Sequence, residues 1–471
     1  MSSLKKIAHG VIRSGLYTYI IFVLRFLVTL VLSRFLSPSE YAVIIVLQIF
    51  TGIILVFQYA GIPSIIVKQQ NNDDTFNNTW HTMSLFIGIV QFGIIALIAF
   101  PAAMFYSEIP LFIPLLLSSV NFIITSLGLV PQAILRKELK FDQLGIYQLY
   151  SFIPSALLAI LMAYTGFSFW SIICQEILLN LIMTCILLFK TRVKLLPFRT
   201  ISIRENYKKQ KKTLSNLFSF SIINYFSRNS DNIIIGKIYS QMELGLYNRA
   251  YSLLYMIIQL IPAIINKVAF PNFSKSNDIY SIRSNIHRLQ VLVVAICFPL
   301  SIPFILFGRE VALFLWGAEW SEVGIYLPYF GVLMLSQVQT FFVVEFLILF
   351  KMQKLITPLG VTIVILNIGS VIIGTFFSVE IIAFLLTLSN TLILWPLIIY
   401  FIYYKVFKLK PFSILFDYFT MVVTCVSMTF SILFNYDTLL YSSLIGLGTS
   451  LIFSNRINLV SLLRYLTITN K

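Results

Sequence analysis

Of the 471 residues in this chain, 58% are hydrophobic and only 11% are charged. A globular domain has about a quarter of its residues charged, so the composition excludes an ordinary water-soluble enzyme and indicates a protein whose solvent is lipid. The net charge of +16 is spread over short segments between apolar runs. That spread argues against a nucleic-acid partner.

Fourteen apolar runs follow one another along the chain, and a bilayer-spanning helix needs roughly 17–25 such residues. They cover residues 14–36, 41–62, 82–106, 109–134, 144–165, 167–189, 214–238, 244–268, 289–307, 323–350, 355–377, 379–404, 412–434 and 438–455. Transmembrane strands alternate apolar and polar residues, and these runs do not. The sequence therefore predicts an all-α integral membrane protein with about 14 transmembrane helices.

Basic residues divide the gaps between the runs into two alternating sets. Twenty-eight of the 34 lysines and arginines lie in every second gap, and the intervening gaps hold only Lys237 and Arg309. Cytoplasmic loops carry such an excess of positive charge, so we expect both termini in the cytoplasm. The first run is expected to be a retained helix and not a signal peptide, since Arg25 interrupts it.

The first run carries Arg25 near its middle, with no acidic residue within a helical turn. A charge at the bilayer centre costs roughly 2.5–3.5 kcal/mol on insertion scales, so Arg25 is expected to face protein or water. Arg34 lies near the outer end and is interpreted as structural, because a long basic side chain there can reach the interface. Arg249 is interpreted as interfacial in the same way.

Two stretches are predicted to lie at the membrane surfaces. Ile279, Ile282, Ile286 and Leu289 recur at helical spacing, which predicts a short amphipathic helix on the inner surface. Residues 308–322 form the longest expected outer loop.

The seventh run carries Ser221, Asn224, Arg228 and Asp231 at spacings of 3, 4 and 3, which places them on one helix face. One interpretation is an Arg228–Asp231 ion pair that locks helix packing. The other is a guanidinium that lines a cavity, oriented by Asp231 and Asn224 and offered to an anionic substrate. A guanidinium fork suits phosphate oxygens.

An internal repeat appears when the sequence is shifted by 203 positions, which lays Arg25 on Arg228, Ser37 on Ser240 and Glu40 on Glu243. It predicts two pseudo-symmetric six-helix lobes around a central cavity, related as parallel repeats. The lobes are expected at residues 1–195 and 214–405, with a basic linker at 196–213 and two further helices and a tail at 406–471. Arg25 and Arg228 are then expected to face each other across the cavity.

Two further sets of polar residues lie within the runs. Tyr251 and Tyr255 follow a four-residue step and are interpreted either as a wall against which sugars stack or as packing residues. Glu176 and Glu345 are candidates for proton or sodium coupling, with interhelical hydrogen bonds as the alternative. The cysteines and histidines show no metal-ligand or catalytic spacing, so we expect no catalytic residue, no metal site and no cofactor.

Four stretches carry a resemblance to a known family: residues 32–41 (LSRFLSPSEY), 131–141 (PQAILRKELKF), 228–237 (RNSDNIIIGK) and 244–251 (LGLYNRAY). In this order and spacing they resemble the polysaccharide transporter (Wzx-like oligosaccharide flippase) family of the multidrug/oligosaccharidyl-lipid/polysaccharide exporter superfamily. The similarity runs through at least the first twelve runs. Ala42 departs from the family pattern, in which a glycine is common.

The resemblance implies a flippase and not an enzyme. Its substrate would be an undecaprenyl-diphosphate-linked oligosaccharide, moved by alternating access across the bacterial cytoplasmic membrane for surface polysaccharide synthesis. Membrane lipids, a polysaccharide polymerase and glycosyltransferases are the implied partners. Two alternatives remain: a drug or metabolite antiporter of the same superfamily, and a membrane-embedded glycan polymerase or transferase.

Overall fold

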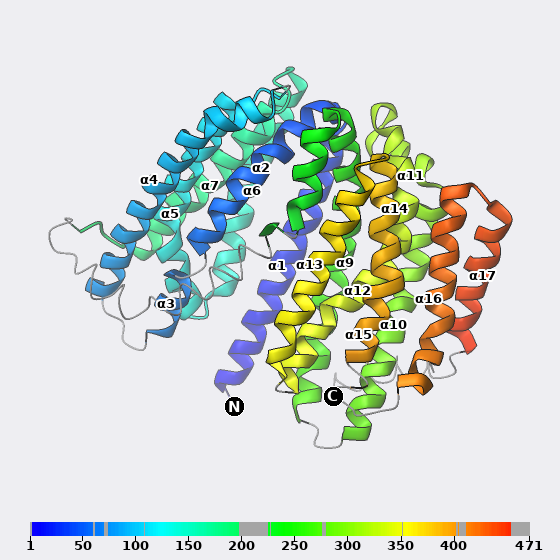
Figure 1. Cartoon of the computed structure of the whole chain (residues 1–471). Coiled ribbons are helices and arrows are strands. Elements are labelled where there is room, and N and C mark those ends of the chain that lie inside the picture. The colour runs from blue at the N-terminus through cyan, green and yellow to red at the C-terminus, as the bar shows by residue number, and fades with distance from the viewer. Residues whose placement is uncertain are drawn as a thin grey trace. The chain divides into compact units, whose positions relative to one another are not determined.

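The computed structural model describes residues 2–59, 62–69, 74–107, 109–196, 225–226, 228–275, 279–350, 352–401, 404 and 411–453. Among these residues all regular structure is helical (Figure 1), which confirms the prediction of an all-α protein. The longer helices are α1 (Ser2–Leu32), α2 (Pro38–Tyr59), α4 (Asp74–Phe105), α5 (Phe112–Lys137), α6 (Phe141–Tyr164), α7 (Trp170–Thr191), α9 (Gln241–Lys275), α10 (Ile279–Leu306), α12 (Leu327–Leu349), α13 (Ile356–Gly374), α14 (Val379–Ser389), α16 (Pro411–Phe434) and α17 (Asp437–Phe453). The short ones are α3 (Ile62–Lys68), α11 (Gly308–Trp316), η2 (Ala318–Ile325), η3 (Gln353–Leu355), η4 (Asn390–Leu394) and α15 (Trp395–Tyr400).

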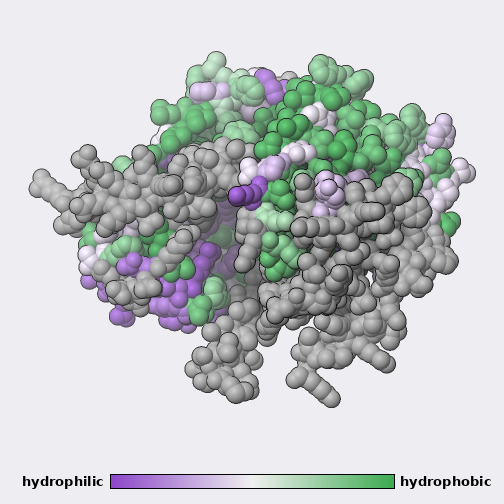
Figure 2. Space-filling view, turned by 60° about the horizontal axis from the view of Figure 1, so that its bottom comes forward, coloured by the Kyte–Doolittle hydropathy of each residue, from purple (hydrophilic) through white to green (hydrophobic). Residues whose placement is uncertain are grey.

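The described helices have the length and surface of membrane spans. Seven of them are long and apolar enough to cross a bilayer, and counting one bent helix pair as a single span makes eight. Large apolar side chains point outward from them, with Leu97 79% exposed and Phe189 80% exposed, and Figure 2 shows apolar side chains over much of the visible surface. The chain is therefore a multi-pass membrane protein, and the count of fourteen spans stays a prediction.

The chain divides into two compact units, Met1–Gly245 and Leu246–Lys471. In the first unit α5 packs between α4 and α7, and α6 packs between α7 and α1. Helix α2 packs against α5 and α4. The predicted lobe boundaries remain a prediction, because residues 197–224 lie outside the described part of the chain.

In the second unit α12 is the central helix, packed against α10, α14, α15 and α16. Its side chains from Val332 to Leu335 are all fully buried. Helices α13 and α14 pair with each other, as do α16 and α17. The apolar character of α12 on every side is what a helix surrounded by other helices requires.

Two sequence predictions about the ends of α10 are wrong. Residues 279–289 do not form a separate surface helix, since α10 runs without a break from Ile279 to Leu306. Residues 308–322, expected as an outer loop, instead form α11 and part of η2, and α11 bends away from α10 by 91°. Short-range periodicity predicted a helix at 279–289 correctly but could not show that it continues into the next span.

The repeat recurs as local structure at the start of α2 and α9. Ser37 and Glu40 form a capping box, in which the Ser37 backbone N–H donates to the Glu40 carboxylate at 2.8 Å and the Glu40 N–H donates to the Ser37 hydroxyl at 3.4 Å. Ser240 and Glu243 form the same pair of bonds, both at 3.2 Å. Each box satisfies two helix N–H groups that would otherwise lack partners.

At one pair of equivalent positions in the first turns, α2 has Ala42 and α9 has Gly245. Ala42 is completely buried. A Cβ atom at position 245 would overlap the backbone carbonyl of Pro38, so the glycine is required by a close approach of two backbones.

Removing either capping hydroxyl should lower stability by a similar amount. We expect Ser37→Ala and Ser240→Ala each to cost about 1 kcal/mol, the usual loss for an N-cap serine, measured as a lower melting temperature of the purified protein in detergent. Ser39→Ala, on the same turn outside the box, is the control. A loss for Ser39→Ala equal to that for Ser37→Ala would contradict the assignment.

Candidate functional site

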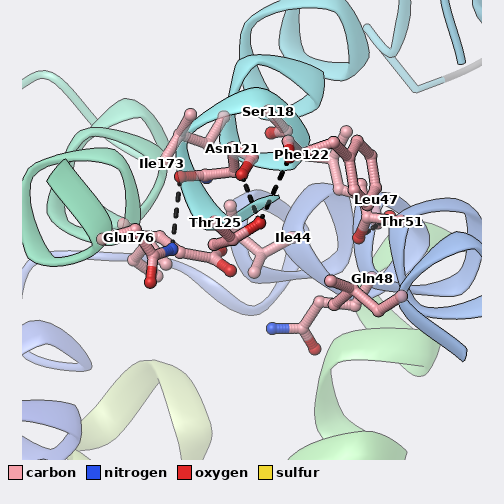
Figure 3. Close-up of a pocket in the computed structure, with 13 residues that line it drawn as sticks. Ile44, Leu47, Gln48, Thr51, Ser118, Asn121, Phe122, Thr125, Ile173 and Glu176 are labelled. Atoms are coloured by element: carbon pink, nitrogen blue, oxygen red, sulfur yellow. Dashed lines mark hydrogen bonds between the residues drawn. The ribbon is translucent and has the colours of Figure 1, made fainter. Parts of the chain in front are cut away.

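A polar pocket opens inside the first unit, between α2, α5 and α7 (Figure 3). Its volume is about 130 Å³. The polar residues that line it are Gln48, Thr51, Ser118, Asn121, Thr125, Glu176 and Asn180. The apolar ones are Ile44, Leu47, Leu55, Phe122, Ile172 and Ile173. All thirteen residues belong to the compact unit Met1–Gly245.

Interhelical hydrogen bonds fix the wall that α5 and α7 contribute. The Asn180 amide donates to the Asn121 amide oxygen at 3.2 Å, and the Thr184 hydroxyl donates to the Ile124 carbonyl at 3.1 Å. Thr125 donates to the Asn121 carbonyl at 2.6 Å. In a low-dielectric interior a polar side chain without a partner costs free energy, and these bonds supply partners to Asn121, Thr125 and Asn180.

Gln48 and Glu176 are the exposed polar residues of the pocket, and the bonds above do not satisfy their polar groups. Neither side chain forms a hydrogen bond within the described part of the chain. Figure 3 shows the Gln48 side chain standing clear of the hydrogen-bonded groups of α5 and α7, and Glu176 on α7 beside them. They are therefore available to a molecule that enters the pocket.

Arg25 lies beside this pocket on α1. Its guanidinium and the Glu176 carboxylate attract each other electrostatically. Within the described part of the chain, the two side chains form no direct ion pair. The Arg25 guanidinium lies 5.9 Å from the centre of the Phe152 ring on α6, and the side chain is exposed. The structure thus brings two predicted site residues, Arg25 and Glu176, into the same region.

Arg228 and Asp231 belong to a described helical stretch at 228–238, where Arg228 is exposed and Asp231 is 6% exposed. Both residues have further interactions. Asn224, predicted to orient Arg228, lies outside the described residues.

The helical stretch with Arg228 is attached to α2 and α4 of the first unit. Three hydrogen bonds to backbone carbonyls hold it: Tyr225 to Ile49 at 2.6 Å, Tyr106 to Ile233 at 3.2 Å, and Lys237 to Phe105 at 2.6 Å. Tyr225 also donates to the carbonyl of Gln48 at 2.9 Å. The backbone of a pocket residue is therefore tied to a residue three positions before Arg228.

The predicted tyrosines of the second unit form a stacked row on α9. Tyr251 and Tyr255 are half-buried, with ring centres 6.4 Å apart, and Tyr247 stacks on Tyr251 at 6.2 Å. Tyr251 also meets Phe330 edge-on at 5.4 Å. Packing therefore uses part of each ring. Glu345 lies on α12, and the position of its side chain is outside the described structure.

Arg249 is not interfacial, as the sequence suggested, but 2% exposed in the second unit. Its guanidinium lies 4.5 Å from the centre of the Trp320 ring and 5.8 Å from that of Trp316. A cation over an aromatic face is attracted by the ring quadrupole, by about 2 kcal/mol when desolvated. Residues 308–325 thus cover Arg249, which position in the sequence alone could not reveal.

Replacing the tryptophan under Arg249 should destabilise the second unit. We expect Trp320→Leu to cost about 3 kcal/mol, since it opens a cavity beside a buried charge, and to lower the melting temperature by several degrees. Phe314→Leu is the matched control on the same segment, because Phe314 is 80% exposed. Equal melting temperatures for the two variants would count against the Arg249–Trp320 contact.

Sequence reasoning missed the contributions of α2 and α5 to the pocket. It selected Glu176 on α7 but not Gln48 or Asn121. The available signal was an amide within each apolar run, Gln48 in one and Asn121 in the other, and an isolated amide does not show which other helix it faces. Within the described residues no group of three or more His, Cys, Asp or Glu residues could hold a metal ion.

Comparison with known proteins places the chain among proteins of polysaccharide biosynthesis. The family model described as "Polysaccharide biosynthesis protein" matches residues 31–324. An uncharacterized membrane protein in the cps region of Klebsiella pneumoniae is 24% identical over 65% of this chain. The lipopolysaccharide biosynthesis protein WzxC of Escherichia coli K12 is 23% identical over 69% of it.

The succinoglycan biosynthesis transport protein ExoT of Rhizobium meliloti is 24% identical over 67% of this chain. The matches span 64%, 66% and 63% of these three relatives' own lengths, slightly under two thirds. A solved structure of the lipid II flippase MurJ, in an inward closed conformation, superimposes with a TM-score of 0.69 over 96% of this chain and 100% of MurJ. At 12% identity that likeness concerns the fold alone.

Proposed function

The chain belongs to the polysaccharide biosynthesis protein family, and we propose that it is a flippase for an undecaprenyl-diphosphate-linked oligosaccharide. It would move this lipid from the inner to the outer leaflet of the bacterial cytoplasmic membrane, with its own termini in the cytoplasm. A relative named as a transport protein and a neighbour in fold named as a flippase support a transporter, not an enzyme.

The observation that carries the proposal is the exposed guanidinium of Arg25 within the apolar stretch Tyr19–Leu32 of α1. It lies seven residues before the end of α1 at Leu32, about 10 Å along the helix axis. An exposed charge at such a depth needs water or a counter-ion. Glu176 attracts it without forming a direct ion pair, so a bound anion would gain a charge-assisted hydrogen bond.

The diphosphate of the lipid is the anion that we assign to this position. We propose that Arg25 and Arg228, one from each half of the repeat, bind the diphosphate, and that Asp231 and Asn224 orient Arg228. Tyr251 and Tyr255 would contact sugars with the ring surface that packing leaves exposed. A guanidinium binds phosphate oxygens through two parallel N–H groups, which a lysine cannot reproduce.

The transport cycle that fits these assignments is alternating access by the two lobes around a cavity. A proton or sodium gradient would drive it through a carboxylate, for which Glu176 and Glu345 are the candidates. The polysaccharide polymerase and the glycosyltransferases would act on the lipid-linked glycan after and before the transfer.

Removing either guanidinium should abolish export without unfolding the protein. We expect Arg25→Ala and Arg228→Ala to lower surface polysaccharide at least tenfold in cells that contain wild-type amounts of the variant. Lysine at either position should restore only part of it, since the charge returns but the bidentate bond does not. Arg34→Ala, a change of an exposed arginine near the end of α1, is the control.

Full export by a well-expressed Arg25→Ala or Arg228→Ala variant would remove that residue from the mechanism. A second measurement separates a flippase from a polymerase or transferase. Purified protein in vesicles receives a labelled lipid-linked oligosaccharide: transfer between leaflets without chemical change supports the flippase, and covalent extension of the glycan contradicts it.

A further inference from the structure

The pocket between α2, α5 and α7 has the chemistry of a carbohydrate subsite. Amides and hydroxyls, which both donate and accept hydrogen bonds, alternate on its walls with aliphatic side chains. The ring of a neutral sugar presents the same mixture, with hydroxyl groups at its edge and C–H groups on its faces. We propose that this pocket binds one uncharged sugar ring of the substrate glycan and thereby selects which glycan is transported.

The size of the pocket limits what it can hold. Its volume of about 130 Å³ is several times what one water molecule needs and below the roughly 300 Å³ of a small ligand pocket. One sugar ring fits this space, whereas an oligosaccharide does not. The remaining sugars would therefore lie outside the pocket.

The hydrogen bonds of the pocket separate its fixed wall from its contact groups. Asn121, Thr125 and Asn180 are held in place by bonds between and within α5 and α7, so their positions are set before a ligand arrives. Gln48 and Glu176 are exposed and form no hydrogen bond within the described residues. An amide opposite a carboxylate can hold two neighbouring hydroxyls of a sugar.

The charges of the pocket favour a neutral sugar over other ligands. Glu176 is the one ionisable residue that lines it, so the carboxylate of a uronic acid would meet a like charge. A metal ion is disfavoured because Arg25 lies within electrostatic reach of Glu176. A sugar bound in this pocket would lie near Arg25, the residue that the proposed function assigns to the diphosphate. The placement of a sugar next to the diphosphate therefore rests on the proposed function.

Binding of short-chain analogues tests the subsite on the purified full chain. The probes are citronellyl diphosphate without sugar and the same diphosphate linked to glucose, galactose, N-acetylglucosamine or glucuronic acid. We expect at least one neutral sugar to tighten binding about tenfold over the sugar-free diphosphate, and glucuronic acid to bind about tenfold more weakly than that sugar.

Two variants and one control assign the effect to the pocket. Gln48→Leu should reduce the gain from the neutral sugar to threefold or less, and Glu176→Gln should bring glucuronic acid within threefold of it. Gln48→Leu should bind the sugar-free diphosphate as wild type does, which also shows that it is folded. The affinities of Glu176→Gln for the sugar probes are compared with its own affinity for the sugar-free diphosphate, because the lost charge lies within electrostatic reach of Arg25. Gln175→Leu, next to Glu176 on α7 but outside the pocket lining, should behave as wild type.

The subsite proposal is overturned when none of the three neutral sugars improves binding, or when Gln175→Leu matches Gln48→Leu. It is also overturned when Glu176→Gln still binds the glucuronic acid probe about tenfold more weakly than the neutral-sugar probe. Failure of the proposed function looks different, because the sugar-free diphosphate itself would then not bind.

Discussion

The constraint on which the structure depends is that a bilayer offers no water to a polar side chain. Within the helices described here, most polar groups satisfy that constraint by bonding to a neighbouring helix or to their own backbone. Asn180 donates to Asn121, and Gln58 donates to Thr125 at 2.9 Å. Such bonds are worth roughly 0.6 kcal/mol each in membrane proteins. They therefore contribute more to the register between helices than to total stability.

The functional interpretation depends on the polar groups that do not satisfy the constraint in this way. Arg25, Gln48 and Glu176 are exposed and lie on three helices of one compact unit. Because an exposed charge in contact with lipid is costly, these side chains indicate a wet region inside the spans. The proposed flippase uses that region for the diphosphate and for one sugar ring, and both depend on the same access to water.

The second unit satisfies the constraint differently, because it buries the guanidinium of Arg249 among other side chains. Arg249 is covered by Trp316 and Trp320, and α11 leaves α10 at 91°. Burial of a charge among aromatic rings removes it from lipid without giving it to a substrate. The arginine of the second unit is thus enclosed by aromatic rings, whereas Arg25 of the first unit is exposed and is the one to which we assign a function.

The sequence predicted the features that follow from composition and local spacing. The all-α class and the membrane spans follow from the length of the apolar runs, and both halves of the repeat contain the same capping box. The family followed from short motifs, and the match over residues 31–324 confirms it. Arg25 and Glu176 were each selected because an ionisable residue inside an apolar run is costly.

The features that the sequence could not predict depend on which helices meet. No spacing within α1 or α7 shows that Arg25 and Glu176 lie near each other, and nothing within α2 shows that Gln48 faces the same pocket. Arg249 resembles an interfacial residue by its distance from the helix start. Its burial depends on a segment about 70 residues later in the chain. Long-range packing decides these positions, and local patterns do not record it.

The most direct test of the central claim is whether water reaches Arg25. In the variants for this test, serine replaces the four native cysteines of the chain, which are Cys174, Cys185, Cys297 and Cys425. One new cysteine is then introduced, either Arg25→Cys or Leu97→Cys. Labelling by a charged, membrane-impermeant methanethiosulfonate is then measured in vesicles open on both sides. The account predicts rapid modification at position 25 and none at position 97, where the side chain points outward and is 79% exposed. An unmodified cysteine at position 25 in a folded protein would contradict it.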